Sequence, residues 1–351
     1  MRPVALVLAL ALFRGASPLP PTRIQLLGLF GAYFEALRVQ TGIPGMAAAI
    51  VSDTDVIWDQ GFGRQDIGHG ISTRADTPFQ LDGVTQLMTA TLLLRCVEEG
   101  RLGLDVPLGQ YIPFSPEPGA TVRQVLTHTS GPPGNLIFSY NVARLELLRP
   151  LFPICFNENL RQAYKDLLLT RLAMVDSMPG LDATVPTLPA EDLATPQEAL
   201  LYAGVLARLA VPYAVSQQGV TASHYGVTTL GPGTGLVSTA RDFAKFDLAL
   251  RQGIFLRGDT LNSAWTPPVR FGRSLPHGMG WFVQSYKGEV VIWQFGSDIN
   301  ASSALMVSLP GRGITLILLA NSDGLAKPAS LVAGDVTVSP FARVFLSLVV
   351  R

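Results

Sequence analysis

Thr77-Pro-Phe-Gln-Leu-Asp-Gly-Val-Thr-Gln-Leu-Met-Thr-Ala90 is the stretch of this chain from which its fold can be inferred. Apolar residues recur at helical spacing from Gly83 to Glu99. Gly100 follows them at the position where a glycine commonly ends a helix. The sequence therefore predicts a helix over residues 83–99.

Segments with the composition of β-strands lie on both sides of this helix, near the two ends of the chain. Before it, an amphipathic helix over 24–39 precedes two β-rich runs that the polar residues 52–55 join into a hairpin. After it, four β-type runs separated by glycine-containing turns lead to a last apolar helix. The predicted strands are 46–51, 56–62, 280–286, 290–295, 303–309 and 314–320, and the last helix is 341–350.

The middle of the chain, about residues 107–268, is rich in proline and glycine and carries short helical patterns with long connections. Strands at both ends with helices between them predict an α+β fold, in which distant parts of the chain complete one antiparallel sheet. We expect a single domain over 22–351, with sheet parts at about 22–78 and 270–351 and an inserted helical subdomain at about 79–269.

Composition excludes several classes of function. Lys plus Arg and Asp plus Glu both number 26, so no basic field is available to attract nucleic acid. His69, His224 and His277 are isolated, and no His-Glu-x-x-His or similar spacing suggests a metal site. The sequence therefore predicts neither a metal nor any other cofactor.

The N-terminus has the layout of a secretory signal peptide over residues 1–17. Arg2 precedes an apolar run from Val4 to Phe13, and small residues follow it. The run is shorter than the ~20 residues that a membrane-spanning helix needs. We expect an exported protein, periplasmic or secreted, without a membrane anchor once the signal is removed; the alternative is an amphipathic or buried N-terminal helix.

Cys96 and Cys155 are the two cysteines of the chain. Export would place them in an oxidising compartment, where disulfides form. Both stand in apolar, helical surroundings, which is typical of cysteines that behave as small buried hydrophobes. We expect unpaired thiols at both positions and leave their pairing open.

Four blocks of sequence resemble, in their order and spacing, the serine β-lactamase and penicillin-binding-protein family, which includes the class C β-lactamases. The blocks are 77–107, 121–131, 233–246 and 316–323. The first resembles the helix that carries the family's nucleophile. The resemblance extends over residues 25–350 and implies a β-lactamase/transpeptidase-like fold with its active cleft between the sheet and the helical part.

The resemblance also implies a catalytic serine and lysine that this chain does not have. In the family, a helix-opening serine attacks a carbonyl carbon, and a lysine three residues later receives its proton. Here the serine position is Gly83 and the lysine position is Gln86, and no Ser-x-x-Lys sequence occurs anywhere in the chain. Glycine offers no nucleophile, and an amide is not a base.

The family's second motif, Tyr-x-Asn or Ser-x-Asn, supplies a proton relay and an amide that holds the substrate. Two registers are open. Ser139-Tyr140-Asn141 fits the Ser-x-Asn form, which we prefer. The apolar spacing of the following helix instead favours Tyr140 as the relay, with Val142 in the asparagine place.

The third motif places a cation or an imidazole on a strand beside the substrate, and here Gln294 stands in that place. The family's oxyanion hole uses two backbone N–H groups, which the resemblance assigns to Gly83 and Ser297. Resemblance thus implies one ligand-binding set, made of Gly83, Tyr140, Asn141, Gln294, Gly296 and Ser297.

Neighbouring polar residues have simpler explanations. We expect Asp82 to cap the helix, the alternative being a negative charge at the mouth of the cleft. We expect His128 to be a partly buried histidine of a structural turn. Thr85 and Ser130 are candidate displaced nucleophiles, but neither has a Lys or His at an interpretable spacing.

Three interpretations follow. The first is an exported, catalytically inactive homologue that binds peptidoglycan-type peptides or acylated ligands. The second is an active hydrolase, esterase or transacylase that uses residues outside the family's pattern, such as Tyr140 with Ser139 or Thr85. The third is a structural partner in a cell-envelope complex, with an empty or a filled cleft. The sequence does not indicate an oligomeric state.

Overall fold

The computed structural model describes residues 23–132, 134–327 and 329–350. The predicted signal peptide, residues 1–17, lies outside the described residues. Within the described ranges, no helix combines the length and the apolar character that crossing a membrane requires.

A seven-stranded antiparallel sheet forms the centre of the molecule, in the order β12-β13-β14-β15-β1-β2-β3. Its strands are β1 (Gly45–Val51), β2 (Val56–Asp66), β3 (Ile71–Ser72), β12 (Phe282–Tyr286), β13 (Glu289–Asp298), β14 (Ser302–Leu309) and β15 (Ile314–Ala320). Strand β1 pairs with β15, with Met46 opposite Ala320. The two ends of the chain therefore complete one sheet, and the predicted α+β architecture is confirmed.

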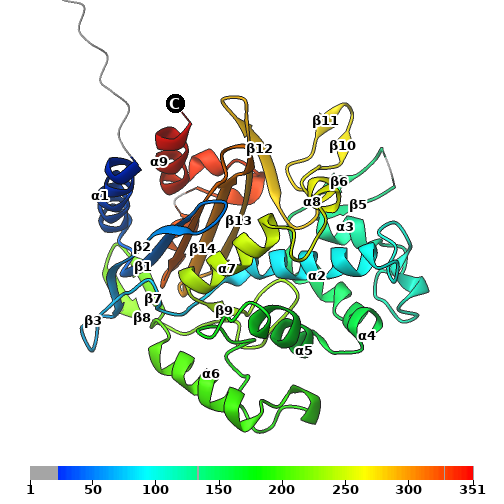
Figure 1. Ribbon diagram of the computed structural model, residues 1–351, viewed down its shortest axis with the longest axis horizontal. Coiled ribbons are helices and arrows are strands. Elements are labelled where there is room, and N and C mark those ends of the chain that lie inside the picture. Colours follow the sequence, from blue (N-terminus) through cyan, green and yellow to red (C-terminus); the bar gives the residue numbers. More distant parts are fainter. Residues whose placement is uncertain (1–22, 133, 328, 351) are drawn as a thin grey trace, which may run out of the picture.

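Alternation along β1 explains why both faces of the sheet are covered. Met46, Ala48 and Ile50 join one apolar core with the helices α1 (Arg23–Thr41) and α9 (Pro340–Val349). The intervening residues of β1 join a second core with α2 (Gln86–Glu98). Because successive side chains of a strand point to opposite faces, the fully buried strand requires a helical layer on each side. Figure 1 shows α1 and α9 on one side and α2 with α7 (Ala240–Arg251) on the other.

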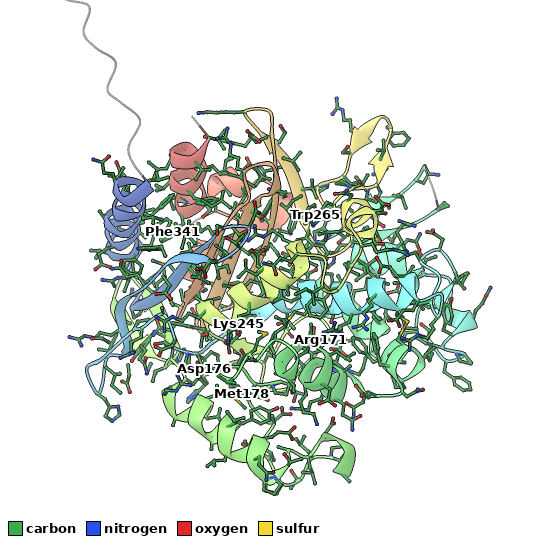
Figure 2. The ribbon with its side chains drawn as sticks, in the orientation of Figure 1. Arg171, Asp176, Met178, Lys245, Trp265 and Phe341 are labelled. Carbon is green, nitrogen blue, oxygen red and sulfur yellow. A yellow bond between two sulfur atoms is a disulfide. The ribbon has the colours of Figure 1, made fainter. Side chains whose placement is uncertain are left out.

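The inserted region is built from short helices, as its composition predicts, and also from small two-stranded pairs, which were not predicted from the sequence. Besides α2 and α7, its helices include α3 (Val122–Leu126), η3 (Val142–Leu148), α4 (Leu151–Phe156), α5 (Leu160–Tyr164), η4 (Lys165–Thr170), α6 (Pro196–Arg208) and α8 (Gly258–Ala264). The paired strands are β4 (Phe79–Gln80) with β9 (Val237–Ser238), β5 (Thr129–Ser130) with β6 (Ile137–Phe138), β7 (Tyr213–Ser216) with β8 (Gly219–Ala222), and β10 (Val269–Arg270) with β11 (Arg273–Ser274). Side chains fill the spaces between these elements (Figure 2).

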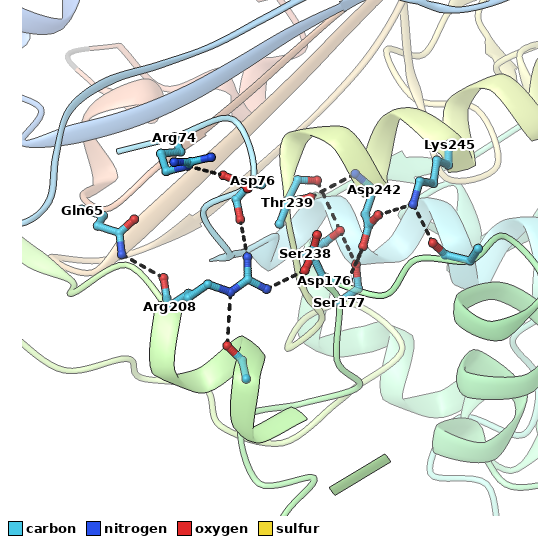
Figure 3. Close-up of polar contacts among 12 residues, drawn as sticks. Gln65, Arg74, Asp76, Asp176, Ser177, Arg208, Ser238, Thr239, Asp242 and Lys245 are labelled. Atoms are coloured by element: carbon cyan, nitrogen blue, oxygen red, sulfur yellow. Dashed lines mark hydrogen bonds and ion pairs between the residues drawn. The ribbon is translucent and has the colours of Figure 1, made fainter. Parts of the chain in front are cut away.

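Polar contacts attach the peripheral helix α6 to the rest of the inserted region (Figure 3). Arg208, at the end of α6, donates to Asp176 Oδ1 at 2.5 Å. Asp242 of α7 accepts from Ser177 Oγ at 2.9 Å and from Lys245 Nζ at 2.7 Å. The segment around residue 176 is therefore held between two helices by charge-assisted hydrogen bonds.

The expectation of unpaired cysteines is wrong. Cys96 of α2 and Cys155 of α4 form a disulfide, with their Cα atoms 5.6 Å apart. Both side chains are buried, as the apolar surroundings predict. The sequence did not reveal that α4 crosses the end of α2 at this point, and the disulfide therefore ties the central helix to the inserted region.

Removing this disulfide should destabilise the protein. It joins residues 59 apart, and a cross-link closing a loop of that length stabilises a fold by about 4 kcal/mol in the chain-entropy model. We expect Cys96→Ser/Cys155→Ser to lower the free energy of unfolding by about 2–4 kcal/mol in urea titrations. After treatment with reductant, the wild type should have a free energy of unfolding close to that of the variant. Equal stability of the oxidised wild type, the reduced wild type and the variant would contradict the prediction.

Candidate functional site

The position that resemblance assigns to the nucleophile lies in a short 3-10 helix, η1 (Asp82–Thr85), which leads into α2. Gly83 is buried, as is every other residue from 81 to 90. A Cβ atom on Gly83 would lie 2.7 Å from the backbone oxygen of Phe295 in β13. A Cβ atom on Gly296 would lie 2.6 Å from the backbone nitrogen of Gly83. The helix start and the strand therefore approach each other at two glycines, and no side chain fits between them without displacement.

Gln86, at the lysine position, is fully buried and uses its amide completely. Its Nε2 donates to Gly83 O at 2.8 Å and to the Tyr140 hydroxyl at 2.9 Å. Its Oε1 accepts from His128 Nε2 at 2.9 Å. His128 Nδ1 accepts from the backbone N–H of Asn141 at 3.2 Å, and this contact assigns the imidazole proton to Nε2.

Tyr140 links this amide to the strand motif. Its hydroxyl accepts from Gln86 and donates to Gln294 Oε1 at 3.2 Å. Gln294 Nε2 in turn donates to His277 Nε2 at 3.1 Å and to Gly280 O at 2.9 Å. His277 completes the chain by donating from Nδ1 to the backbone oxygen of Gly278 at 2.6 Å.

We call the side chains of Gln86, His128, Tyr140, Gln294 and His277 the buried polar network. Each polar hydrogen named above has an acceptor, and the donor and acceptor roles agree along the whole chain of contacts. Such a satisfied network fixes side-chain positions strongly in a low-dielectric interior. It leaves none of these groups poised to accept a proton from a substrate.

Burial keeps the network electrically neutral. Desolvation lowers the pKa of His128 to about 3 and holds the pKa of His277 well below its usual range. The two imidazole rings meet edge to face at 4.7 Å between centroids, so protonation of one disfavours protonation of the other. Desolvation also raises the pKa of the Tyr140 hydroxyl, and a phenolate is therefore not available at neutral pH.

Asp82 does not cap the helix, contrary to expectation. No side-chain hydrogen bond caps η1, and Oδ2 of the Asp82 carboxyl group accepts instead from Ser302 Oγ at 2.9 Å. The residue is 3% exposed and adopts a left-handed backbone conformation with φ 47°. Desolvation, together with the nearby negative charge of Asp298, raises the pKa of Asp82 to about 8. The side chain is therefore mainly protonated at neutral pH and adds no full negative charge at the mouth of the cleft.

The structure separates the remaining predicted residues from the buried polar network. Ser139, Asn141 and Ser297 are exposed, whereas the Tyr140 hydroxyl points into the network. The preferred register, with Ser139 as the relay, is therefore not the one that the structure has. Tyr140 occupies the relay place because the backbone of residues 139–141 hydrogen-bonds to His128 on either side of it.

Within the described residues, neither of the displaced nucleophiles suggested by the sequence hydrogen-bonds to a lysine, a histidine or a carboxylate. Thr85 is fully buried, and its Oγ1 accepts from the backbone N–H of Leu236 at 3.4 Å. Ser130 is exposed in β5, where it lines a cavity of about 620 Å³ together with Thr129 and Gln124. Among the described residues, no cluster of three potential ligands suggests a metal site.

The sequence did not reveal that His128 and His277 lie in one cluster. The sequence predicts His128 as a partly buried histidine of a turn, whereas it is 1% exposed. Its contact with Gln86 joins residues 42 positions apart, and His277 meets Gln294 across a separation of 17. The available signal was the pair of buried glutamines, because a buried amide requires several hydrogen-bonding partners.

Comparisons with known proteins agree with this architecture. The family model described as Beta-lactamase matches residues 30–335. Penicillin-binding protein 4* of Bacillus subtilis is 25% identical over 77% of this chain and 66% of its own length. The human mitochondrial serine beta-lactamase-like protein LACTB is 26% identical over 27% of this chain, and the match spans 19% of the length of LACTB. An octameric penicillin-binding protein homologue from Pyrococcus abyssi superimposes with a TM-score of 0.72 at 18% identity, covering 91% of this chain and 77% of its own.

The buried Asp82 should make stability fall as pH rises. Its pKa is raised in the folded state, so the native protein binds more protons than the unfolded chain between the ordinary pKa of 3.8 and about 8. Above pH 6.5, the ordinary pKa of histidine, the two buried imidazoles no longer oppose this trend. Between pH 6.5 and 8, the free energy of unfolding of the wild type should fall by about 2 kcal/mol. We expect this fall to be absent in Asp82→Asn.

Urea titrations of the wild type and the variant across this pH range provide the measurement. Asparagine keeps an acceptor for Ser302 and tolerates the left-handed backbone, so the difference between the two curves isolates the ionisation of Asp82. Parallel curves would show that Asp82 titrates normally.

Proposed function

The chain belongs to the β-lactamase family, and we propose that it is a non-catalytic member whose former catalytic centre serves as part of its folded core. One observation carries the proposal: a side-chain carbon at Gly83 would lie 2.7 Å from the backbone oxygen of Phe295. A non-bonded carbon and oxygen do not lie this close, so one of the two elements would have to move. The atom in the way belongs to the backbone and not to a flexible side chain. The site therefore lacks both a nucleophile and the space for one.

The buried polar network supports the same conclusion, because it contains no group that could act as the catalytic base. A catalytic lysine would need a neutral amine near the nucleophile, whereas Gln86 holds its place with a neutral amide bonded to three partners. His128 hydrogen-bonds to Gln86, and His277 packs against His128; both imidazoles are neutral and hydrogen-bonded. General acid-base catalysis needs a group whose pKa is matched to the working pH and that reaches the substrate.

The network instead joins parts of the molecule that are distant in sequence. It connects the start of α2 with the turn at His128, with Tyr140 and with β13. In this role the centre behaves like other buried polar clusters, which fix one arrangement of packed elements. We infer a structural or partner-binding role in the cell envelope, the third interpretation of the sequence. A peptidoglycan-type peptide or acylated ligand would be limited to the exposed rim at Asn141 and Ser297.

Export remains part of the proposal. The disulfide between Cys96 and Cys155 supports it, because disulfides form and persist in oxidising compartments and are rare in the cytosol. Expression of the full chain with a C-terminal tag, followed by cell fractionation and N-terminal sequencing, tests export. A mature protein that begins near residue 18 would support it, whereas an intact N-terminus in the cytosol would contradict it.

Acyl-enzyme probes test the absence of catalysis. We expect neither a fluorescent penicillin nor a fluorophosphonate to form a covalent adduct with the native chain, measured by intact mass. The Gly83→Ser/Gln86→Lys variant should also remain unlabelled, because its serine carbon would collide with Phe295 O and its lysine would be buried beside two imidazoles. A penicillin-reactive family member serves as the positive control. An adduct on the native chain would contradict the proposal, and peptide mapping would identify the nucleophile.

Stability measurements test the steric part separately. Gly83→Ala should lower the free energy of unfolding by about 1–3 kcal/mol, the usual cost of overpacking a core. Gly204→Ala is the matched control, because Gly204 lies in α6 and nothing stands within 4 Å of its added carbon. That variant should be more stable by about 1 kcal/mol, the difference in helix propensity between the two residues. Equal effects at both glycines would mean that the centre is open.

A further inference from the structure

An exposed hairpin precedes the sheet's edge strand β12 and takes no part in the proposed function. Strands β10 and β11 form it, and residues 269–273 are here called the hairpin tip. Phe271 is 77% exposed and Val269 is 59% exposed. Large apolar side chains at the end of a protruding element are unusual on a soluble surface and indicate a contact with another surface.

The backbone conformation of Phe271 at the hairpin tip is energetically unfavourable. Phe271 has φ 48°, a left-handed conformation that bulky residues rarely adopt, and Gly272 follows with φ 73°. Asparagine or glycine would satisfy this two-residue turn without strain. A phenylalanine there is unfavourable for folding, so its presence is better explained by what the ring contacts outside the chain.

Two arginines flank the ring. The Arg270 guanidinium lies over the Phe271 ring, 4.9 Å from its centroid, and Arg273 is exposed. Neither makes an ion pair with any part of the chain that the structure describes. The sequence from residue 260 to residue 288 contains no acidic residue. The tip therefore presents an aromatic ring and two unneutralised positive charges to the same neighbour.

A second hairpin, formed by β5 and β6, stands beside the first. The two hairpins lie together at one end of the molecule in Figure 1. Ser130 and Leu136 of the second hairpin line the same 620 Å³ cavity as Pro268, which directly precedes β10. Ile137 is 54% exposed, and the segment 129–138 carries no charged residue. This face therefore offers apolar side chains from two elements.

The acidic groups near this face are already neutralised. Asp105 and Glu117 line the shared cavity, and each carboxylate is bound by an arginine through two nitrogens. Their partners are Arg123 and Arg144, with shortest contacts of 2.7 Å in both pairs. These pairs leave Arg270 and Arg273 to determine the sign of the charge that the tip presents.

We propose that this face binds the surface of an anionic lipid membrane. Phe271, with Val269 and Ile137 beside it, enters the boundary between headgroups and acyl chains, while Arg270 and Arg273 contact lipid phosphates. Aromatic and aliphatic side chains combined with basic residues are typical of proteins that lie on a membrane. A lipid surface fits better than an acidic protein, because a protruding ring needs no preformed pocket in a bilayer.

Vesicle co-sedimentation of the full chain tests the proposal. The probes are vesicles of phosphatidylcholine alone and vesicles in which about a third of the lipid is phosphatidylglycerol. The wild type should bind the anionic vesicles and not the neutral ones. Phe271→Ala should weaken binding about tenfold at every salt concentration, because it removes buried apolar area. Arg270→Gln/Arg273→Gln should weaken it about tenfold or more at low salt and should flatten the salt dependence.

Two control variants match these changes away from the tip. Arg343→Gln removes an exposed arginine from α9, and Leu200→Ala removes a side chain that is 78% exposed on α6. Both should bind vesicles like the wild type. Thermal unfolding of all variants confirms that they fold, and Phe271→Asn, which suits the left-handed turn, provides a second ring-deleting variant.

Three outcomes would overturn the proposal. The first is no binding of the wild type to anionic vesicles at low salt. The second is unchanged binding when Phe271 is replaced by either Ala or Asn. The third is binding of soluble polyglutamate that competes fully with vesicles and does not depend on Phe271, which would indicate an acidic protein partner. None of these results bears on the probe reactions at Gly83, so the two proposals fail independently.

Discussion

The close approach of Gly83 to Gly296 is the contact on which the rest of the candidate site depends. At this contact the start of the central helix and strand β13 are so near that a single added carbon on either glycine would collide with backbone of the other element. The contact buries the helix start, and Gln86, His128 and Gln294 around it are buried as well, whereas Tyr140 is half-buried. Exclusion of solvent then determines which charges those side chains can carry.

The residues at positions 83 and 86 therefore depend on each other. Without a side chain at residue 83, the strand can close against the helix, and closure removes water from the position of residue 86. A lysine there would have to lose its charge or remain unpaired beside two neutral imidazoles, and both alternatives are unfavourable. Glutamine avoids the problem because its amide satisfies a carbonyl, a hydroxyl and an imidazole at once. Gly83 and Gln86 are thus parts of one packing arrangement.

Sequence patterns were sufficient for the sheet and insufficient for the site. Strands near both ends of the chain show periodicity and turn residues that depend only on local sequence, and their pairing across β1 and β15 follows from the fold class. The disulfide between Cys96 and Cys155, the bond from Asp82 to Ser302, and the meeting of His128 with Gln86 all join residues that are distant in sequence. A single sequence contains no local signal for such contacts. The choice of Tyr140 over Ser139 depended likewise on which residue the turn directs inward.

If the proposed loss of catalysis is correct, the function of this chain lies at its surface. Fold alone does not determine activity, because activity resides in specific side chains carried by the scaffold. In this chain the polar side chains at the candidate site are hydrogen-bonded to one another and mostly buried. Phe271 and Arg273 are exposed, Arg270 is half-buried, and neither arginine makes an ion pair with the described residues. Selection for folding alone would favour the opposite arrangement at a left-handed turn. At the hairpin tip, the residue present is not the one that would make the fold most stable. Positions of this kind are expected to be functional.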